Sequence, residues 1–256
     1  MCSIFGILNI QGDIKSLRPK ALKLSAKMRH RGPDWSGSWN NNQAILVHER
    51  LAIVDMENGS QPLFNNNKTH ILAVNGEIYN HKTLAENLNC DYQFKTKSDC
   101  EIILPLYEEF GTKFVDKLQG MFAFVLYNEA DNSYLIARDH MGIIPLYTGY
   151  DSEGNFYVAS EMKALMPICK TVSEFPPGHI LDSRVGEIQR YYKRNWQQYG
   201  AIKDNHTSKT KLREALEESV KSHLMTDVPY GVLLSGGLDS SLISAITQKF
   251  AARRIE

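Results

Sequence analysis

The sequence shows no excess of charge of either sign. Its 29 Lys and Arg residues balance 29 Asp and Glu residues, so it lacks the basic surface that attracts nucleic acid or anionic membranes. No apolar run approaches the roughly 20 residues that a membrane-spanning helix needs. The start of the chain has no cationic segment or cleavage site of a secretory signal. We therefore expect a cytoplasmic protein without nucleic-acid or membrane partners.

Cysteine is also scarce. The four cysteines are Cys2, Cys90, Cys100 and Cys169, and no two of them form a C-x-x-C pair. This spacing favours neither a disulfide framework nor a zinc site. We expect free thiols, with Cys90 and Cys100 buried in the core.

Hydrophobic periodicity predicts a mixed first domain. Four apolar runs bounded by polar residues predict strands: 44–47, 71–74, 121–127 and 134–137. Residues 16–28 and 98–110 repeat their apolar positions with helical spacing. Ser98 can cap the second helix, with Glu101 completing a capping box. Together these elements predict an α+β layered domain.

The pattern changes near residue 191. Residues 191–208 have no sustained period, and we interpret them as a linker after a first domain of residues 2–190. A helical pattern then covers residues 209–225, with Ser208 as its N-cap. A second domain therefore begins at Lys209.

The second domain continues as a strand, a glycine-rich turn and a helix. The apolar strand is expected at 231–234, the turn at 235–241, and the helix from about 242 to 254. This order is typical of a parallel α/β sheet, which needs further strands to cover its edges. Residues 209–256 therefore correspond to an incomplete domain.

Cys2 is a candidate nucleophile if Met1 is removed. A thiol attacks an amide carbon only as a thiolate, so it needs a base. The freed α-amino group, with a pKa of about 8, can take the thiol proton directly or through one water. Taken alone, Cys2 is weak evidence, because many proteins begin in this way.

Four other residues suit the chemistry of amide hydrolysis. Asn75 and Gly76 follow the strand expected at 71–74, where a side-chain amide and a backbone N–H could bind a tetrahedral oxyanion; a β-turn is the alternative. Arg50 can hold a carboxylate through two parallel hydrogen bonds. Asp99 can pair with an α-ammonium group. The alternative for both charged residues is a solvated surface position.

Several segments resemble a known family. They are MCSIFG (1–6), HRGPD (30–34), NGEIYN (75–80), SDCE (98–101), GMFAF (120–124), RDHMG (138–142), SEMKAL (160–165) and FPPG (175–178). In this order, over the whole chain, they are similar to the class II, or N-terminal nucleophile, glutamine amidotransferases. Within that family the chain resembles the bacterial type of glutamine-dependent asparagine synthetase.

The resemblance implies a fold and a catalytic centre. It implies a four-layer αββα sandwich for the first domain and the first part of an ATP pyrophosphatase-like α/β domain for the second. Cys2 would form a glutamyl thioester, and Asn75 and Gly76 would bind the oxyanion. This half-reaction would need no cofactor.

The resemblance also implies how L-glutamine is bound. Arg50 would hold its α-carboxylate, while Glu77 and Asp99 would receive its α-amino group. Main-chain groups would line the same pocket at Leu51, Ala52, Ile53 and Val54.

The glycine-rich turn resembles the pyrophosphate loop of the ATP pyrophosphatases. A turn before a helix N-terminus presents backbone N–H groups to phosphate oxygens. The resemblance implies ATP binding by Leu234, Ser235, Gly236, Gly237, Asp239 and Ser240, with Asp239 helping to hold Mg²⁺. In the family, ATP activates L-aspartate and ammonia converts it to asparagine. Because residues 209–256 cannot complete the sheet, we expect glutamine hydrolysis but no asparagine synthesis from this chain alone.

Other interpretations stay open at this point. The chain could be the glutaminase domain of another class II enzyme, such as a sugar-phosphate or phosphoribosyl amidotransferase, although the turn at 235–241 argues against it. It could also be a catalytically silent remnant or a glutamine-binding module, since a retained Met1 would leave Cys2 without its base. The oligomeric state is not determined, and a homodimer is one option.

Overall fold

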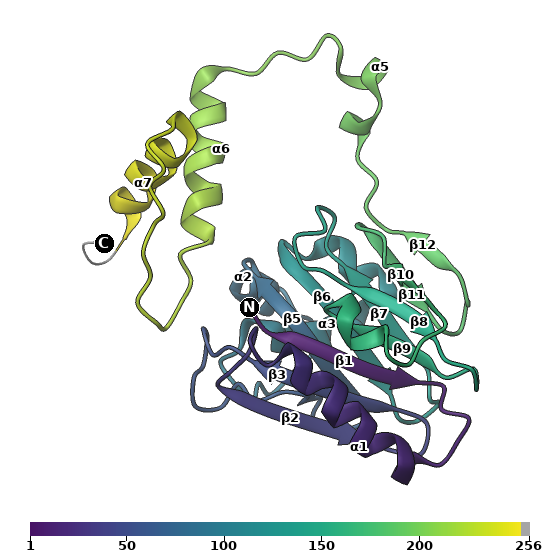
Figure 1. Ribbon diagram of the computed structural model, residues 1–256. Helices are drawn as coiled ribbons and strands as arrows, with labels where there is room; N and C mark the ends of the chain where they lie inside the picture. The colour runs from purple at the N-terminus through teal and green to yellow at the C-terminus, as the bar shows by residue number, and fades with distance from the viewer. Residues whose placement is uncertain (252–256) are drawn as a thin grey trace. The chain divides into compact units, whose positions relative to one another are not determined.

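The structure, a computed structural model, describes residues 1–251 except for the side chain of Asn195 (Figure 1). It divides into two compact units, Met1–Tyr192 and Lys193–Glu256. No helix in the described part of the chain is long and apolar enough to cross a membrane.

Two antiparallel sheets of six strands form the first unit. Sheet A has the order β10-β8-β9-β1-β3-β2, and sheet B has the order β12-β11-β7-β6-β5-β4. The strands of sheet A are β1 (Ser3–Leu8), β2 (Trp35–Asn40), β3 (Ile45–Arg50), β8 (Tyr147–Tyr150), β9 (Phe156–Ala159) and β10 (Thr171–Glu174). Those of sheet B are β4 (Leu63–Phe64), β5 (His70–Ile78), β6 (Gly120–Asn128), β7 (Tyr134–Arg138), β11 (His179–Asp182) and β12 (Ile188–Arg190).

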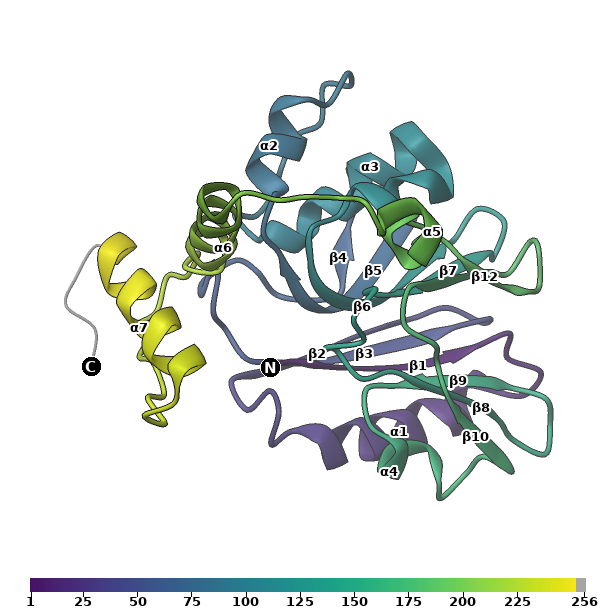
Figure 2. The same cartoon turned by 90° about the horizontal axis from the view of Figure 1, so that it is seen from above.

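Helices cover the outer face of each sheet (Figure 2). Sheet A carries α1 (Ile14–Ser25), the 3₁₀ helix η1 (Ala26–Met28) and α4 (Met162–Leu165). Sheet B carries α2 (His81–Glu86), η2 (Asp99–Ile102), α3 (Ile103–Phe110) and η3 (Gly111–Lys117). The two sheets pack face to face, so the first unit is the expected four-layer αββα sandwich.

The period-two alternation of the strands builds three apolar layers. Along β5, Ile71 and Ala73 face the layer between the sheets, whereas Leu72 and Val74 face the layer under α3 and η3. Along β1, Ile4 and Leu8 face the layer between the sheets, and the intervening apolar side chains face α1. Central strands are therefore apolar on both faces, which explains why their sequences are continuous apolar runs.

The four expected strands and both expected helical segments of the first domain are confirmed, with changes at the ends. Residues 98–110 form η2 followed by α3, and the hydroxyl of Ser98 accepts the N–H of Cys100 at 3.3 Å. The capping box is wrong. The Glu101 carboxylate instead accepts the N–H groups of Lys95 and Thr96, each at 2.8 Å, because the preceding loop folds over it.

Up to Ala251, the second unit contains four helical segments: η4 (Asn195–Gln197), α5 (Tyr199–Ile202), α6 (Lys209–Ser222) and α7 (Leu238–Phe250). The expected linker therefore holds two short helices. Ser208 caps α6 by accepting the N–H of Lys211 at 3.1 Å. Lys249 of α7 donates to Glu217 of α6 at 2.6 Å.

Two expectations for the second unit are corrected. Residues 231–234 are not a strand; they form irregular backbone in which Leu233 is 96% exposed, since no described strand pairs with them. The last helix begins earlier than expected, at Leu238, and ends at Phe250. The part of the expected helix beyond Ala251 lies outside the described residues.

The cysteines match the expectation in part. All four are free thiols and Cys100 is buried, but Cys90 is exposed on the surface and is not a core thiol. It follows α2 in a polar segment, where no apolar layer covers it.

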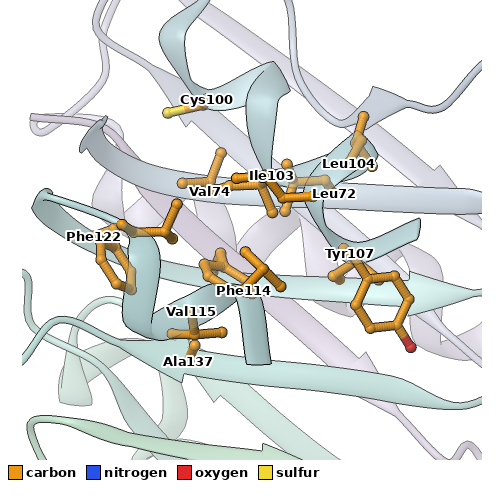
Figure 3. Close-up of a cluster of buried hydrophobic side chains, with 14 of the residues drawn as sticks. Leu72, Val74, Cys100, Ile103, Leu104, Tyr107, Phe114, Val115, Phe122 and Ala137 are labelled. Carbon is orange, nitrogen blue, oxygen red and sulfur yellow. The ribbon is translucent and has the colours of Figure 1, made fainter. Parts of the chain in front are cut away.

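Phe114 offers a test of the layer beneath α3 and η3. Its ring lies at the centre of this layer, fully buried among side chains of β5, β6 and α3 (Figure 3). Phe114→Ala should lower the free energy of unfolding by about 3–5 kcal/mol, because it leaves a large cavity. Phe94→Ala is the matched control at a position 42% exposed, and it should cost about 0.5 kcal/mol or less. Equal losses in urea denaturation would contradict this assignment of the core.

Candidate active site

Cys2 lies at the entrance to the layer between the two sheets. It precedes β1, where Ile4 and Leu8 face that layer, so alternation turns Cys2 to the same side. Its sulfur accepts the backbone N–H of Leu51 at 3.3 Å, and its carbonyl oxygen accepts Nε of Arg31 at 3.1 Å. The start of the chain is therefore anchored to two neighbouring segments.

Burial changes both ionisable groups at the start of the chain. It raises the pKa of the Cys2 thiol, although the hydrogen bond from Leu51 opposes this effect. It lowers the pKa of the terminal amino group, which Met1 carries here. A thiol that is harder to ionise needs a base, and an amine with a lowered pKa is more often neutral at pH 7.

Asn75 and Gly76 lie inside β5 and do not follow it. They pair with Ala123 and Phe122 of β6, so the alternative of a β-turn is wrong. A Cβ atom on Gly76 would lie 2.2 Å from the carbonyl oxygen of Met121, and φ at Gly76 is 155°. Only glycine allows β6 to approach this closely. The sequence analysis ended the strand before Asn75 because Asn and Gly are also typical of turns.

One edge of β5 has no neighbouring strand at this point, because β4 pairs only with Ile71 and Leu72. Side chains take the place of a strand there. The side chain of Gln61 accepts the N–H of Val74 at 2.8 Å, and Nε2 of His48 lies 3.0 Å from the carbonyl oxygen of Val74. Four residues further along β5, Asp99 accepts the N–H of Ile78 at 2.6 Å.

Alternation along β5 then places two hydrogen-bond donors in the site. Backbone groups of an antiparallel strand point to opposite edges in turn, so the N–H of Gly76 faces the same open edge as those of Val74 and Ile78. The Asn75 side chain is 1% exposed, and its Nδ2 has no hydrogen-bond partner among the described residues. A buried amide N–H without a partner is costly, and a bound oxygen would satisfy it.

Two carboxyl groups lie on the same side of the cavity. Burial, and next the charge of Asp99, raise the pKa of Glu77 to about 7. Burial also raises the pKa of Asp99, which is 3% exposed. Asp99 is therefore not the solvated surface charge that was the alternative.

Arg50 ends β3 and is only 6% exposed, so the surface alternative is wrong for it as well. Its guanidinium donates to the carbonyl oxygens of Val54 and Met56, both at 3.2 Å, and of Asp55. A Cβ atom on Gly59 would lie 2.6 Å from Nη2 of Arg50. Arg50 thus holds the loop that follows it and keeps its charge beside the cavity.

These groups surround one cavity of about 510 Å³, counting the space at its open mouth. Of the residues expected in the glutaminase site, it brings together Cys2, Arg50, Leu51, Ile53, Val54, Asn75, Gly76, Glu77 and Asp99. Ala52 is the exception. It does not line the cavity, and its N–H donates to Asp34 at 2.9 Å.

The cavity also includes residues that the sequence did not indicate as site residues: Gly59, Gln61, Ser98, Cys100, Met121 and Ile144. Ser98 and Cys100 flank Asp99, which is a signal that could have been used. Gly59 and Gln61 carry no local signal, because only the loop held by Arg50 brings them to the cavity.

The residues expected to bind ATP lie in the second unit. Gly237 precedes α7 without a side-chain cap, and the hydroxyls of Ser235 and Ser240 are 2.9 Å apart. Leu234, Gly236 and Asp239 are exposed. Within residues 1–251, no group of three or more His, Cys, Asp or Glu side chains is placed to hold a metal ion.

Two family models match the chain. The glutamine amidotransferase domain matches residues 1–183, and asparagine synthase matches residues 211–256. Asparagine synthetase B [glutamine-hydrolyzing] of Escherichia coli (strain K12) is 64% identical over 256 residues, which are all of this chain and 46% of that protein. A probable asparagine synthetase [glutamine-hydrolyzing] of Dictyostelium discoideum is 50% identical, over 100% of this chain and 47% of that protein. The chain thus spans about half the length of these curated relatives.

A solved structure supports the fold. A glutamine phosphoribosylpyrophosphate amidotransferase from B. subtilis has a TM-score of 0.61 and 20% identity, and the match covers 100% of this chain and 65% of that one. At this identity the likeness bears on the fold alone. Because the amidotransferase model matches well over half of the residues, the chain belongs to the family of glutamine amidotransferase domains.

Proposed function

We propose that this chain is the N-terminal part of a glutamine-hydrolysing asparagine synthetase, and that its first unit hydrolyses L-glutamine to L-glutamate and ammonia. One observation carries the proposal: the buried Asn75 amide has an unpartnered N–H in the same cavity as the Cys2 thiol. A nucleophile and an oxyanion donor around one cavity are what acyl transfer from an amide requires.

The mechanism begins with the removal of Met1. The α-amino group of Cys2 takes the thiol proton, and the thiolate attacks the carboxamide carbon of glutamine. Asn75 Nδ2 and the N–H of Gly76 stabilise the oxyanion. When the C–N bond breaks, the α-ammonium group gives its proton to the departing nitrogen, which leaves as ammonia. Water then hydrolyses the thioester, releases glutamate and restores the thiol.

The charged groups around the cavity orient the substrate. Arg50 binds the α-carboxylate, while Glu77 and Asp99 receive the α-ammonium group. The backbone around Leu51, Ile53 and Val54 lines the pocket. This places the carboxamide at Cys2 and gives the α-ammonium group two carboxyl partners in the same cavity.

The second unit contributes the ATP-dependent half of the reaction in the complete enzyme. Its match to the asparagine synthase family supports this, and it weighs against another class II amidotransferase. The residues present fit a phosphate: no described side chain caps the N-terminus of α7, where helix N–H groups point outward, and Ser235 and Ser240 add hydroxyls. Leu234, Gly236 and Gly237 would shape the loop, and Asp239 would help to hold Mg²⁺. ATP would activate L-aspartate for attack by ammonia.

We assign residues 2–190 to the amidotransferase domain, 191–208 to a linker and 209–256 to the start of the synthetase domain. The matched ranges of the two family models support these bounds, as does the division into compact units after Tyr192.

The first prediction for this function concerns the nucleophile. The purified chain should release glutamate from glutamine without ATP, and Cys2→Ala should abolish this release while the circular dichroism spectrum stays unchanged. Cys2→Ser should be nearly as inactive, because a hydroxyl is far harder to ionise than a thiol. Intact mass confirms that Met1 has been removed. Undiminished activity in folded Cys2→Ala would refute the proposal.

Removal of the oxyanion donor should act on the chemical step. Asn75→Ala should lower kcat by about 10² to 10³, with a smaller effect on KM. Asn155→Ala is the matched control, since Asn155 is equally buried but bonds Asp151 away from the cavity. The control should lose stability and keep kcat per folded molecule. If both variants kept a normal kcat, Asn75 would have no role in catalysis.

The raised pKa of Glu77 predicts a pH dependence of glutamine binding. Below about 7 the Glu77 carboxyl is protonated and stops attracting the α-ammonium group, so affinity falls as pH falls. Calorimetric titration of glutamine into the Cys2→Ala variant should show about tenfold weaker binding at pH 6 than at pH 8. Glu77→Gln should bind weakly at both values. A wild-type-like pH dependence in Glu77→Gln would contradict the assignment.

A further inference from the structure

Two sequence segments without a role in the proposed mechanism meet beside Cys2. Arg31, from the segment 30–34, donates Nε to the carbonyl oxygen of Cys2 at 3.1 Å and Nη1 to Oε1 of Glu161 at 3.2 Å. Glu161, from the segment 160–165, directly precedes α4. A chain of two hydrogen bonds therefore connects the Glu161 carboxylate to the backbone of the nucleophile.

The residue before Glu161 holds the start of β1 in place. β9 pairs with β1 as far as Ala159, opposite Phe5. Beyond it, the N–H of Ser160 donates to the carbonyl of Ile4 at 3.0 Å, and its hydroxyl accepts the N–H of Ile4 at 2.9 Å. Ser160 thus holds the backbone of Ile4 through two hydrogen bonds. The next residue, Glu161, holds Cys2 through Arg31.

The charges around Glu161 show that Arg31 depends on it. The side chain of Arg31 is 15% exposed, and its Nη2 is buried without a hydrogen-bond partner among the described residues. Glu161 is the carboxylate that pairs with this guanidinium, and Lys163 and His30 contact it as well, at 2.8 Å and 3.1 Å. Partial burial raises the pKa of Glu161, but hydrogen bonds from Lys163 and Arg31 outweigh this and hold the pKa below its ordinary value.

We propose that Glu161 is a positioning residue of the active site, which acts through Arg31 to fix the carbonyl group of Cys2 and so the direction of the thiol. The inference rests on the proposed glutamine hydrolysis. A terminal residue has no preceding strand to orient it, and a displacement of about 1 Å at a reacting atom can cost as much as 10² in rate. The hydrogen bond from Arg31 supplies the missing constraint.

The same pair also affects the proposed base. In the structure Met1 carries the terminal amino group beside this site, and four charged or ionisable groups act on it: Cys2, Arg31, Glu77 and Asp34. Of these, Arg31 lowers the pKa of the Met1 amino group through its positive charge. Because its guanidinium bonds the carbonyl of Cys2, it should act in the same direction on the amino group that Cys2 carries once Met1 is removed. Loss of the negative charge at Glu161 leaves Arg31 less compensated, so the pKa of the amino group should fall further. A purely structural role for Glu161 would not move this pKa.

The test compares Glu161→Ala and Glu161→Gln with a matched control. Glu174→Ala is the control, because Glu174 also pairs with a buried arginine, Arg138, at 2.6 Å but lies elsewhere in the fold. Glu161→Ala should lower kcat for glutamine hydrolysis by about 10- to 100-fold with little change in KM. Glu161→Gln should fold normally, lose less activity and shift the acidic limb of its pH–kcat profile to lower pH. The control should keep both kcat and profile.

A double-mutant cycle separates this inference from the proposed function. In the Arg31→Ala background, Glu161→Ala should cause no further loss of kcat, because its effect passes through Arg31. If both Glu161 variants kept the wild-type kcat and pH profile, or if the two losses multiplied, the inference would be overturned. A wild-type chain without its Met1 that fails to hydrolyse glutamine would instead refute the proposed function itself.

Discussion

The site depends on one constraint, which is that β5 runs on past the end of β4 while it stays paired with β6. Residues Val74 to Ile78 therefore belong to a rigid strand with one open edge. Gln61, His48 and Asp99 satisfy the backbone at that edge. Gly76 is required because β6 passes too close for any Cβ atom. The proposed oxyanion donors are thus held by the sheet itself, which is how a preorganised site avoids reorganisation during the reaction.

The two sheets pack face to face, and this packing brings the other residues of the site close to these donors. Alternation along β1, β3 and β5 turns Cys2, Arg50, Asn75 and Glu77 toward the layer between the sheets, at the end where that layer opens. Burial there raises the pKa of the Glu77 and Asp99 carboxyl groups. The same low-polarity layer that stabilises the fold therefore sets the protonation of the groups that we propose bind the substrate.

Local patterns in the sequence predicted much of the first unit but little of its long-range geometry. Apolar runs located β3, β5, β6 and β7, and the residue patterns proposed Cys2, Asn75, Arg50 and Asp99 for the chemistry. The four-layer arrangement came from resemblance alone. Local sequence also suggested a turn at Asn75 and a capping box at Glu101. Instead, Asn75 pairs with β6, and Glu101 accepts hydrogen bonds from the preceding loop. Neither the strand pairing that buries Asp99 nor the contact between Arg31 and Glu161, 130 residues apart, has a local signature.

The central claim is that Cys2 is the nucleophile, and the cavity holds a second thiol, Cys100, that makes the claim easy to contradict. The most direct measurement is labelling of the purified chain with a glutamine analogue that carries an electrophilic diazoketone in place of the carboxamide, followed by peptide mass mapping. The account predicts one adduct per chain, on the N-terminal Cys2, and protection by excess glutamine. An adduct on Cys100 with Cys2 unmodified would contradict it.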